Sequence, residues 1–486
     1  MRVLFLNPPS FMGFDGGAGA RYQARREIRS FWYPAWLAYA AGLVKESLLV
    51  DAPPADMGIE EVVRAGKGFH MAVIHTSTPT IRNDCAVAQK FKEAYPGILV
   101  GFVGPHAMTL PLETLQSSDS IDFVCTGEFD YTIAEIAEGR DFREVSGVAY
   151  LQDGKLVRTP DRPLITDLDA LPFVTDIYAR DLKIENYYDG YLDHPYMAIY
   201  TARGCLARCA FCLWPQTIGG RAYRTRSPEN VYAEMSRAKS LFPQVKEYYF
   251  DDDTFTGNPS RAAGLAKLIG PLGLKWSATA RANVSYETLK VLKENGLRLL
   301  VVGFESGNQR ILDNIKKGIT VEGAKKFVRA CKELGILIHA CFIMGLPGET
   351  AGTIEETIRF AKWIDPYSIQ VSLPAPYPGT ELYRQAVKEG WLETAREELD
   401  RGQDKPEGQK ELVKGGIQTA VLSYPHLPKE EIFEAVERFY RRFYFRPRPV
   451  LRILKEMLSD REVFKRRARE GREFLSFMAK RKEAAR

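Results

Sequence analysis

Long apolar runs are missing from this sequence, and cysteines and histidines are few. Nowhere do about 18 apolar residues follow one another without a charge, so we expect no membrane-spanning helix. The apolar run near the N-terminus, Val3–Leu6, is too short for a signal peptide. Seven cysteines and six histidines in 486 residues argue against a disulfide framework, so a reducing cytoplasm fits best.

The bulk composition is that of a soluble globular protein. Hydrophobic residues make up 45% of the chain and charged residues 27%, so disorder is not expected as the main state. A chain of 486 residues is too long for one ordinary domain and long enough for two or three cores.

Residues 1–165 alternate short apolar strands with helical stretches. This order is typical of a parallel sheet with helices on its faces, a Rossmann-like arrangement whose ligands bind beyond the carboxyl ends of the strands. The expected strands are Val3–Leu6, Leu48–Ala52, Met71–His75, Ile98–Val103 and Phe123–Thr126. A hairpin is expected around Asp153-Gly154, and residues 166–192, which contain Pro172, are expected to form a linker.

Residues 193–400 repeat the strand–helix order in longer units. Six such units predict a partial (β/α)6 barrel, with its chemistry at the carboxyl ends of the strands. The expected strands are Met197–Thr201, Glu247–Phe250, Lys275–Thr279, Leu299–Phe304, Ile336–Phe342 and Ser368–Leu373. Residues 401–486 are expected to be helical and basic.

Three cysteines, Cys205, Cys209 and Cys212, share one loop after an expected strand. Thiolates at Cys-x-x-x-Cys-x-x-Cys spacing can each ligate an iron. A four-iron cluster held by three ligands leaves one iron open, and that iron can chelate a molecule with an amine and a carboxylate, such as the methionine end of S-adenosylmethionine (SAM). Structural zinc is one alternative, but it wants four ligands. Core cysteines are another, although Arg203 and Arg208 argue against a buried apolar strand.

The cysteine loop and the polar residues after later strands resemble the radical SAM superfamily. The resemblance implies a [4Fe-4S] cluster that cleaves SAM to a 5′-deoxyadenosyl radical, with an electron donor such as flavodoxin or ferredoxin. The residues that it assigns to SAM are Phe211, Asp251, Asp252, Asp253, Ser277, Arg281, Glu305, Met344 and Gly345. A carboxylate would pair with the SAM ammonium, and a glycine would allow close approach of the backbone. The alternatives are an Asx turn for the aspartates and a structural ion pair for Arg281 or Glu305.

Strand-end residues of the first region resemble the cobalamin-binding subclass of these enzymes. The residues that carry this likeness are Asn7, Pro8, Ser77, Thr78, Thr80, Gly104, Pro105, His106, Gly127 and Glu128. No Asp-x-His-x-x-Gly occurs, so a histidine in place of the lower axial base is not indicated, and Val103 stands where a glycine is usual. The alternatives are a domain that binds substrate or only supports the barrel, and a structural role for His106.

Three stretches also resemble the radical SAM enzymes of hopanoid side-chain biosynthesis, in particular those linked to the cyclitol ether head group of bacteriohopanetetrol. They are Phe11–Leu37, the cysteine loop and the tail Arg438–Lys482. The likeness implies a radical ring contraction of an amino-sugar head group on a membrane triterpenoid. One alternative is a cobalamin-dependent C-methyltransferase that acts on a lipid or other small molecule. Another is a metal-bearing scaffold without turnover.

The C-terminal stretch Arg438–Arg486 is basic, with 17 Lys and Arg against six Asp and Glu. Its aromatic and aliphatic residues are interleaved with these cations, which suits peripheral contact with the inner face of an anionic membrane. Packing of the apolar stripe on the barrel, with the arginines reaching outward, is the alternative. Because no RNA-binding module is recognised, we do not expect a nucleic-acid partner.

Overall fold

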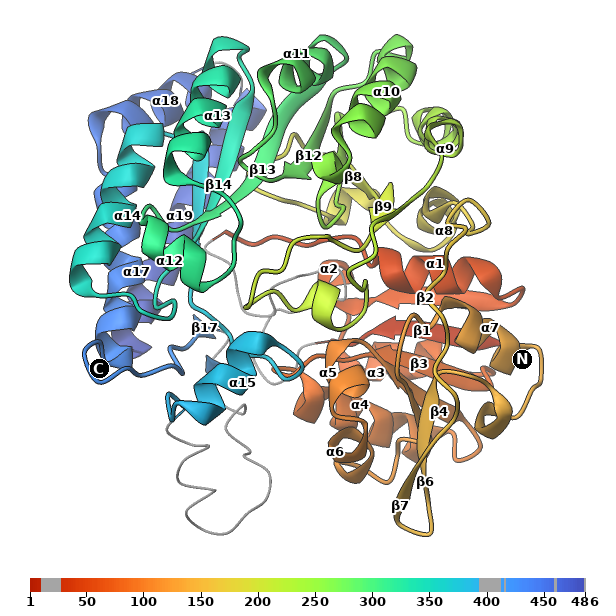
Figure 1. The fold of residues 1–486 in the computed structure, drawn as a ribbon. Coiled ribbons are helices and arrows are strands. Elements are labelled where there is room, and N and C mark those ends of the chain that lie inside the picture. The colour runs from red at the N-terminus through yellow and green to blue at the C-terminus, as the bar shows by residue number, and fades with distance from the viewer. Residues whose placement is uncertain (10–27, 393–411, 415–416, 459–460, 485–486) are drawn as a thin grey trace.

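The computed structural model describes all of the chain except residues 10–27, 393–411, 415–416, 459–460 and 485–486. Two α/β units stand next to each other, the N-terminal one in red and orange and the second in green and cyan (Figure 1). The C-terminal helices, in blue, pack against the second unit (Figure 1). The glycine-rich part of the stretch 11–37 and the boundary expected at residue 400 lie outside the described residues.

The N-terminal unit is a seven-stranded sheet with the order β2-β1-β3-β4-β5-β6-β7. Its strands are β1 (Val3–Asn7), β2 (Ser47–Asp51), β3 (Met71–His75), β4 (Leu99–Val103), β5 (Phe123–Cys125), β6 (Val148–Gln152) and β7 (Lys155–Arg158). Strands β1 to β5 pair in parallel, and β6 and β7 form the antiparallel hairpin expected around Asp153-Gly154. The predicted sheet is therefore confirmed.

Alternate side chains of this sheet face two different cores. Val3 and Phe5 join a large core that continues into the second unit, whereas Leu4 and Leu6 join a smaller one on the other face. The helices of the unit are α1 (Ala35–Leu43), α2 (Ala52–Ala55), α3 (Ile59–Ala65), α4 (Ile81–Ala94), α5 (Pro105–Thr109), α6 (Pro111–Gln116) and α7 (Asp130–Ala137). Residues of α1 and α7 belong to the large core, so these two helices join the sheet to the barrel.

The second unit is a six-stranded parallel sheet with the order β15-β14-β13-β12-β11-β8. Its strands are β8 (Tyr196–Ile199), β11 (Glu247–Phe250), β12 (Trp276–Ala280), β13 (Leu297–Glu305), β14 (Leu337–Ile343) and β15 (Ser368–Ser372). Among the described residues β8 and β15 do not pair with each other, so this sheet is the open partial barrel that the sequence predicts. A short antiparallel pair, β9 (Ala202–Arg203) and β10 (Arg224–Thr225), brackets the cysteine loop.

The barrel helices begin where a polar side chain can accept a hydrogen bond from the backbone of the first turn. They are α9 (Pro228–Leu241), α10 (Pro259–Ile269), α11 (Tyr286–Glu294), α12 (Gln309–Asn314), α13 (Val321–Glu333), α14 (Ala351–Ile364) and α15 (Glu381–Lys388). Their capping residues are Ser227, Asn258, Ser285, Asn308, Thr320, Thr350 and Thr380. The expected linker contains a helix, α8 (Val174–Asp181), whose Val174 and Tyr178 are buried in the core.

The C-terminal region covers the open edge of the barrel. It contains β16 (Val413–Lys414), β17 (Ile417–Gln418), α17 (Lys429–Tyr444), α18 (Pro447–Met457) and α19 (Arg461–Ala484). The backbone N–H groups of Ile369 and Val371 on β15 donate to the hydroxyls of Tyr444 and Tyr440 at 3.1 and 2.8 Å. Helix α17 therefore satisfies donors that an edge strand would otherwise expose.

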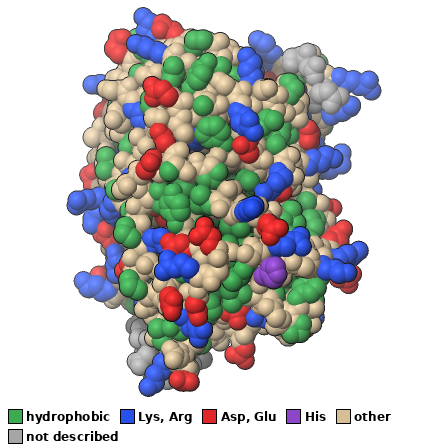
Figure 2. Space-filling model, turned by 90° about the vertical axis from the view of Figure 1, so that its right-hand side faces the viewer, with side chains coloured by type: hydrophobic (Ala, Val, Ile, Leu, Met, Phe, Trp, Pro, Cys, Tyr) green, Lys and Arg blue, Asp and Glu red, His purple; other side chains and the backbone are tan. Residues whose placement is uncertain are grey.

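The apolar side chains of α17 join the large core of the barrel, as the second interpretation of the tail expects, but some arginines of this region pair with protein groups instead of reaching outward. Arg446 donates to Asp365 at 2.7 Å, and the buried Arg481 lies 3.9 Å above the ring of Phe433. Contact with a membrane stays a prediction. Of the helices that the structure describes, none is both long and apolar enough to cross a bilayer. On the face at the right of Figure 1, cations and anions are interspersed (Figure 2), so this face has no patch of a single sign.

Candidate active site

A cavity of about 320 Å³ lies at the carboxyl ends of the barrel strands. The predicted residues in its wall are Cys205, Cys209, Phe211, Cys212, Asp251, Asp253, Arg281 and Glu305. They come from the cysteine loop, from the residues after β11 and β12, and from the end of β13. These segments meet because parallel strands end at one edge of a sheet.

The cysteine loop is held by a tight backbone contact and by one glutamine. Gly204 has a φ of 86°, and a Cβ there would lie 2.2 Å from the carbonyl oxygen of Ala222, so glycine is required. The side chain of Gln216 donates to the carbonyl of Cys212 at 2.6 Å and accepts from the backbone N–H of Glu381 at 3.0 Å. No sequence pattern marks Gln216, although it fixes the loop to α15.

The three aspartates after β11 have different roles. Asp252 is fully buried, and its carboxylate accepts hydrogen bonds from the backbone N–H and the hydroxyl of Thr201, both at 2.6 Å. Burial raises the pKa of Asp252, although the bonds from Thr201 act in the opposite direction. Asp253 accepts from the N–H of Gly204 at 3.1 Å and also lines the cavity, as Asp251 does. Asp252 therefore supports the cysteine loop from outside the cavity wall.

A buried ion pair stands beside the cysteines. Glu305 has a φ of 64°, an unfavourable conformation of the kind that collects at functional sites, and accepts from Lys317 at 2.7 Å. Burial acts to lower the pKa of Lys317, but Glu305 and Cys209 raise it, and the net shift is upward. Arg281 places Nη1 3.9 Å from the sulfur of Cys209. The sequence analysis did not identify Lys317, because nothing in the sequence distinguishes it from the neighbouring Lys316, which is exposed.

Besides Asp252, three residues assigned to SAM are not part of this cavity wall. Ser277 is fully buried and donates to the carboxylate of Glu247. Met344 is also fully buried. Gly345 has a φ of 97°, and a Cβ there would lie 2.4 Å from Ile432 of α17, so its close approach is to that helix. Contact of these three residues with SAM stays a prediction.

Several of the residues assigned to cobalamin bond to the protein itself. Asn7 donates to Asp51 at 2.6 Å, and the hydroxyl of Thr80 donates to Asp84 at 2.5 Å. The backbone N–H of Ser77 donates to the hydroxyl of Thr80 at 2.9 Å. Pro8 and Pro105 are buried, and Gly127 has open space where a Cβ would lie.

Glu128 belongs to an ion cluster that joins the two units. Its carboxylate accepts from Arg224 at 2.8 and 2.9 Å, from Arg203 at 3.4 Å and from the N–H of Ile165 at 2.8 Å. Arg203 also binds both carboxylate oxygens of Asp130 at 2.9 Å. Glu128 thus bonds to protein groups here, and its contact with cobalamin stays a prediction. These bonds correct the expectation for Arg203, which is buried because two carboxylates neutralise its charge.

Two histidines near strand ends of the N-terminal unit each have a ring nitrogen with no hydrogen-bond partner in the described part of the chain. The Nε2 atoms of His75 and His106 are buried and accept or donate no hydrogen bond there. His106 Nδ1 lies 3.2 Å from the hydroxyl of Thr78, and burial lowers the pKa of His106 to about 4. Gly104 has a φ of 107°, and a Cβ there would meet the carbonyl of Thr76 at 2.4 Å. Buried polar atoms of this kind call for a partner such as a ligand or water.

No group of three or more His, Cys, Asp or Glu side chains in the described residues is gathered tightly enough to hold a single metal ion. The zinc alternative therefore finds no preformed centre in that part of the chain. A four-iron cluster is larger than one ion, and its ligands sit at separate corners.

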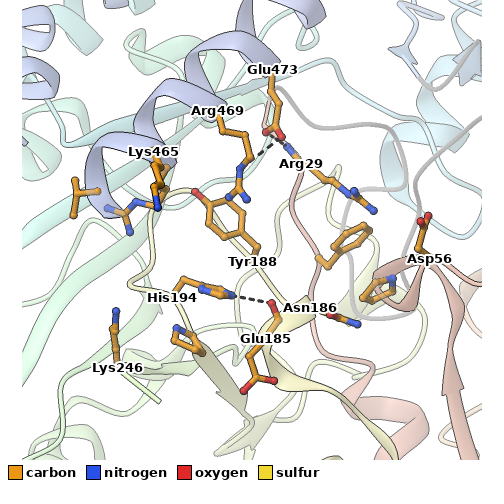
Figure 3. Close-up of a pocket in the computed structure, with 15 residues that line it drawn as sticks. Arg29, Asp56, Glu185, Asn186, Tyr188, His194, Lys246, Lys465, Arg469 and Glu473 are labelled. Carbon is orange, nitrogen blue, oxygen red and sulfur yellow. Dashed lines mark hydrogen bonds and ion pairs between the residues drawn. The ribbon is translucent and has the colours of Figure 1, made fainter. Parts of the chain in front are cut away.

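A larger hollow, of about 1050 Å³, is drawn in Figure 3, and none of the three loop cysteines is among the residues that line it. Its wall combines Arg469 and Glu473 of α19 with His194, which precedes β8 and so lies toward the amino ends of the barrel strands. The backbone N–H of Arg29 donates to Glu473 at 3.1 Å, and the His194 ring is 2.9 Å from the carbonyl of Glu185. Barrel chemistry belongs at the opposite end of the strands, so we do not assign this hollow to the reaction.

Comparisons with known proteins agree with this geometry. The sequence matches the radical SAM superfamily over residues 199–361, which include the cysteine loop. An uncharacterized methyltransferase, PH0819, of Pyrococcus horikoshii is 30% identical over 466 residues, 93% of this chain and 94% of that protein. An anaerobic magnesium-protoporphyrin IX monomethyl ester cyclase of Rubrivivax gelatinosus is 28% identical over 466 residues, 91% of this chain and 77% of that protein.

Among solved structures, the radical SAM methyltransferase TsrM of Kitasatospora setae, with cobalamin and a [4Fe-4S] cluster bound, has a TM-score of 0.67 at 17% identity and covers 100% of both chains. The chain therefore belongs to the radical SAM superfamily. It is an enzyme of that class, and its fold is that of a cobalamin-binding radical SAM methyltransferase.

Proposed function

We propose that this enzyme is a cobalamin-dependent radical SAM methyltransferase that acts on a small molecule. One observation carries the proposal: Cys205, Cys209 and Cys212 line the same strand-end cavity as Arg281 and Glu305. The likeness of nearly the whole chain to a protein named as a methyltransferase supports methyl transfer, and so does the fold shared with TsrM.

The three cysteines would hold a [4Fe-4S] cluster and leave its fourth iron for SAM. When bound, the cluster supplies the electron that cleaves SAM, and cobalamin supplies the methyl group for transfer. Phe211 lies on the cavity wall and would exclude water from the cysteine loop. Asp252 and Ser277 would act as positioning residues through Thr201 and Glu247.

Charges on the cavity wall match the two charges at the methionine end of SAM. Asp251 and Asp253 can accept hydrogen bonds from an ammonium group, and Arg281 and Lys317 can donate to a carboxylate. Arg281 lies 3.9 Å from the sulfur of Cys209, so a carboxylate bound to this guanidinium would stay next to the cysteine loop. Met344 and Gly345 remain candidates for contact with adenine.

We place cobalamin between the two units, against the strand ends of the N-terminal sheet. The partnerless ring nitrogens of His75 and His106 support this placement. The late barrel loop also reaches this sheet, since a Cβ on Gly379 would lie 2.5 Å from Thr109 of α5. The candidates for contact with cobalamin are Asn7, Pro8, Ser77, Thr78, Thr80, Gly104, Pro105, His106, Gly127 and Glu128.

The comparisons favour methyl transfer over the ring contraction of a hopanoid head group that the sequence led us to expect. The hopanoid resemblance has no counterpart in the relatives named above. Both reactions start from cleavage of SAM, so one experiment separates them.

That experiment is turnover of the anaerobically reconstituted enzyme with added cobalamin, a reduced flavodoxin as electron donor, SAM carrying a deuterated methyl group, and a lipid or polar extract as the source of substrate. Methyl transfer consumes two SAM molecules: one becomes S-adenosylhomocysteine, and the other becomes methionine and 5′-deoxyadenosine. We expect both nucleosides together with a deuterated product. 5′-Deoxyadenosine without S-adenosylhomocysteine would favour ring contraction, and neither nucleoside would contradict the radical SAM assignment.

Matched variants make the same test specific. Cys205→Ala should abolish both nucleosides. Cys331→Ala should retain them, because Cys331 is a buried cysteine of α13 that lies outside the cavity.

A further inference from the structure

A second, apolar cavity of about 340 Å³ lies beside the candidate active site. Residues of β14, β15, α17, α18 and α19 line it, together with Ile28, Ser30, Asp189, Gly190 and Tyr191. Its apolar lining includes Ile28, Ile369, Val450, Ile453, Leu454 and Phe474. Tyr191 and Gln370 line both this cavity and the active-site cavity, so the two meet at these side chains.

The two cavities follow one another along one face of the barrel sheet. On β14, His339 lines the apolar cavity and Cys341 lines the active-site cavity. On β15, Ser368 lines the first, Ser372 lines the second, and Gln370 between them lines both. Because residues two apart on a strand face the same side, the two cavities lie next to each other along this face of the sheet.

The main polar groups on the wall of the apolar cavity are occupied by protein partners. Arg467 forms ion pairs with Glu456 and Glu470 at 2.5 and 2.6 Å. The hydroxyls of Tyr440 and Tyr444 accept from the edge of β15, as described above. A ligand here would meet mainly hydrocarbon.

The mouth of this cavity is rimmed by exposed apolar side chains. The rim residues are Phe445 (66% exposed), Val450 (40%), Leu454 (49%) and Leu475 (59%). Single exposed apolar residues are common, but four around one opening form a patch that indicates a binding site. The other side of α19 is different: Lys465 and Arg469 line the larger hollow (Figure 3).

We propose that the substrate is an amphiphile whose reacting end lies in the active-site cavity and whose apolar tail passes Tyr191 and Gln370 into the apolar cavity. The inference rests on the proposed function, because it takes the cysteine cavity as the place of reaction. The volume of 340 Å³ falls within the range of about 300–1,000 Å³ that is typical of small-molecule sites. The adjacency of this cavity to the active site, at the shared residues Tyr191 and Gln370, is the reason to assign it to part of the substrate, such as a hydrocarbon chain or a fused-ring group.

The occupant can be tested with dansylamino-undecanoic acid, a fluorescent probe, bound to the full-length reconstituted protein and displaced by 1-decanol. Dansylglycine, which lacks the hydrocarbon chain, is the control probe. The matched variants are Gly471→Phe and Gly264→Phe. Both glycines lie inside helices, α19 and α10, and a Cβ on either meets no atom within 4 Å. Only Gly471 lines the apolar cavity, and replacing a glycine inside a helix favours the helix.

We expect the wild type and Gly264→Phe to bind the probe equally, and Gly471→Phe to bind it about tenfold more weakly because the phenyl ring fills the apolar space. Leu475→Asp, a change at the exposed rim, should also weaken binding. Equal affinity of the wild type and Gly471→Phe, or equal binding of dansylglycine, would overturn the proposal.

The outcome also separates this inference from the proposed function. A protein that binds the probe but forms no S-adenosylhomocysteine contradicts methyl transfer alone. A protein that forms S-adenosylhomocysteine but does not bind the probe contradicts the tail cavity alone.

Discussion

The carboxyl ends of the two sheets carry similar polar residues but use them differently. After the barrel strands, Arg281 and Glu305 lie on the wall of one cavity with the cysteines. After the strands of the N-terminal sheet, Asn7 directs its amide to Asp51 and Glu128 accepts from two arginines. The same residue types thus build a cavity in one unit and hold structure together in the other.

The difference shows that a polar residue at a strand end marks a ligand site only when protein partners leave it available. Glu128 looks like a ligand-binding residue in the sequence, yet Arg224, which donates two hydrogen bonds to its carboxylate, comes from the second unit. In the N-terminal unit the polar atoms that lack a partner, as far as the structure is described, include ring nitrogens of His75 and His106. His75 belongs to no motif that the sequence analysis identified.

The largest effect on stability is expected from replacing Arg203, because this arginine of the second unit bonds to Glu128 and Asp130 of the N-terminal unit. Arg203→Ala would leave Glu128 and Asp130 buried with less compensating charge. We expect it to lower the free energy of unfolding by about 3–5 kcal/mol, as measured by guanidinium chloride denaturation. The matched control is Arg208→Ala, an exposed arginine of the same loop, which should change stability by at most about 0.5 kcal/mol. Similar values for the two variants would contradict a stabilising role of the ion cluster.

A smaller effect on stability is expected from two glycine substitutions, one after a strand of each unit. Gly204→Ala puts a Cβ 2.2 Å from the carbonyl oxygen of Ala222 at a φ of 86°, so we expect a loss of about 1–3 kcal/mol and a lower iron content after reconstitution. Gly127→Ala, at a strand end of the N-terminal unit, meets no atom within 4 Å. It should leave stability and iron content near those of the wild type. Thermal unfolding and iron analysis of both variants give the answer, and an unchanged Gly204→Ala protein would contradict the tight loop.

A third test concerns the pH dependence of stability and Asp51, the partner of Asn7. Burial raises the pKa of Asp51 from 3.8 to about 7, against the hydrogen bonds from Asn7 and Tyr187. A folded-state pKa above the unfolded value means that the folded protein binds the proton more tightly. The contribution of Asp51 to stability is therefore fully present below about pH 4 and is lost as the pH rises toward 7.

Asp51→Asn should flatten the dependence of the urea midpoint on pH over that window. Asp56→Asn, at an exposed position close by, should leave the slope as it is in the wild type. If the two variants have the same slope, Asp51 does not titrate as described.

The sequence alone predicted the strands of both sheets and placed the cysteines on a loop, because strand periodicity and motif spacing are local properties. It could not predict partners that meet only in the fold. Lys317 reaches Glu305 because the turn after α12 folds over β13, and Gly345 approaches Ile432 of α17, which lies far along the chain. The apolar cavity is equally hidden, since it depends on how α18 and α19 close the open side of the barrel.

The most direct test of the central claim is the metal content of anaerobically reconstituted wild type and cysteine variants. If Cys205, Cys209 and Cys212 hold the cluster, the wild type should contain about four irons and four sulfides per chain. Alanine at any of the three positions should remove most of both, and Cys331→Ala should keep them. Zinc in place of iron in the wild type, or a full iron content in Cys205→Ala, would contradict the account.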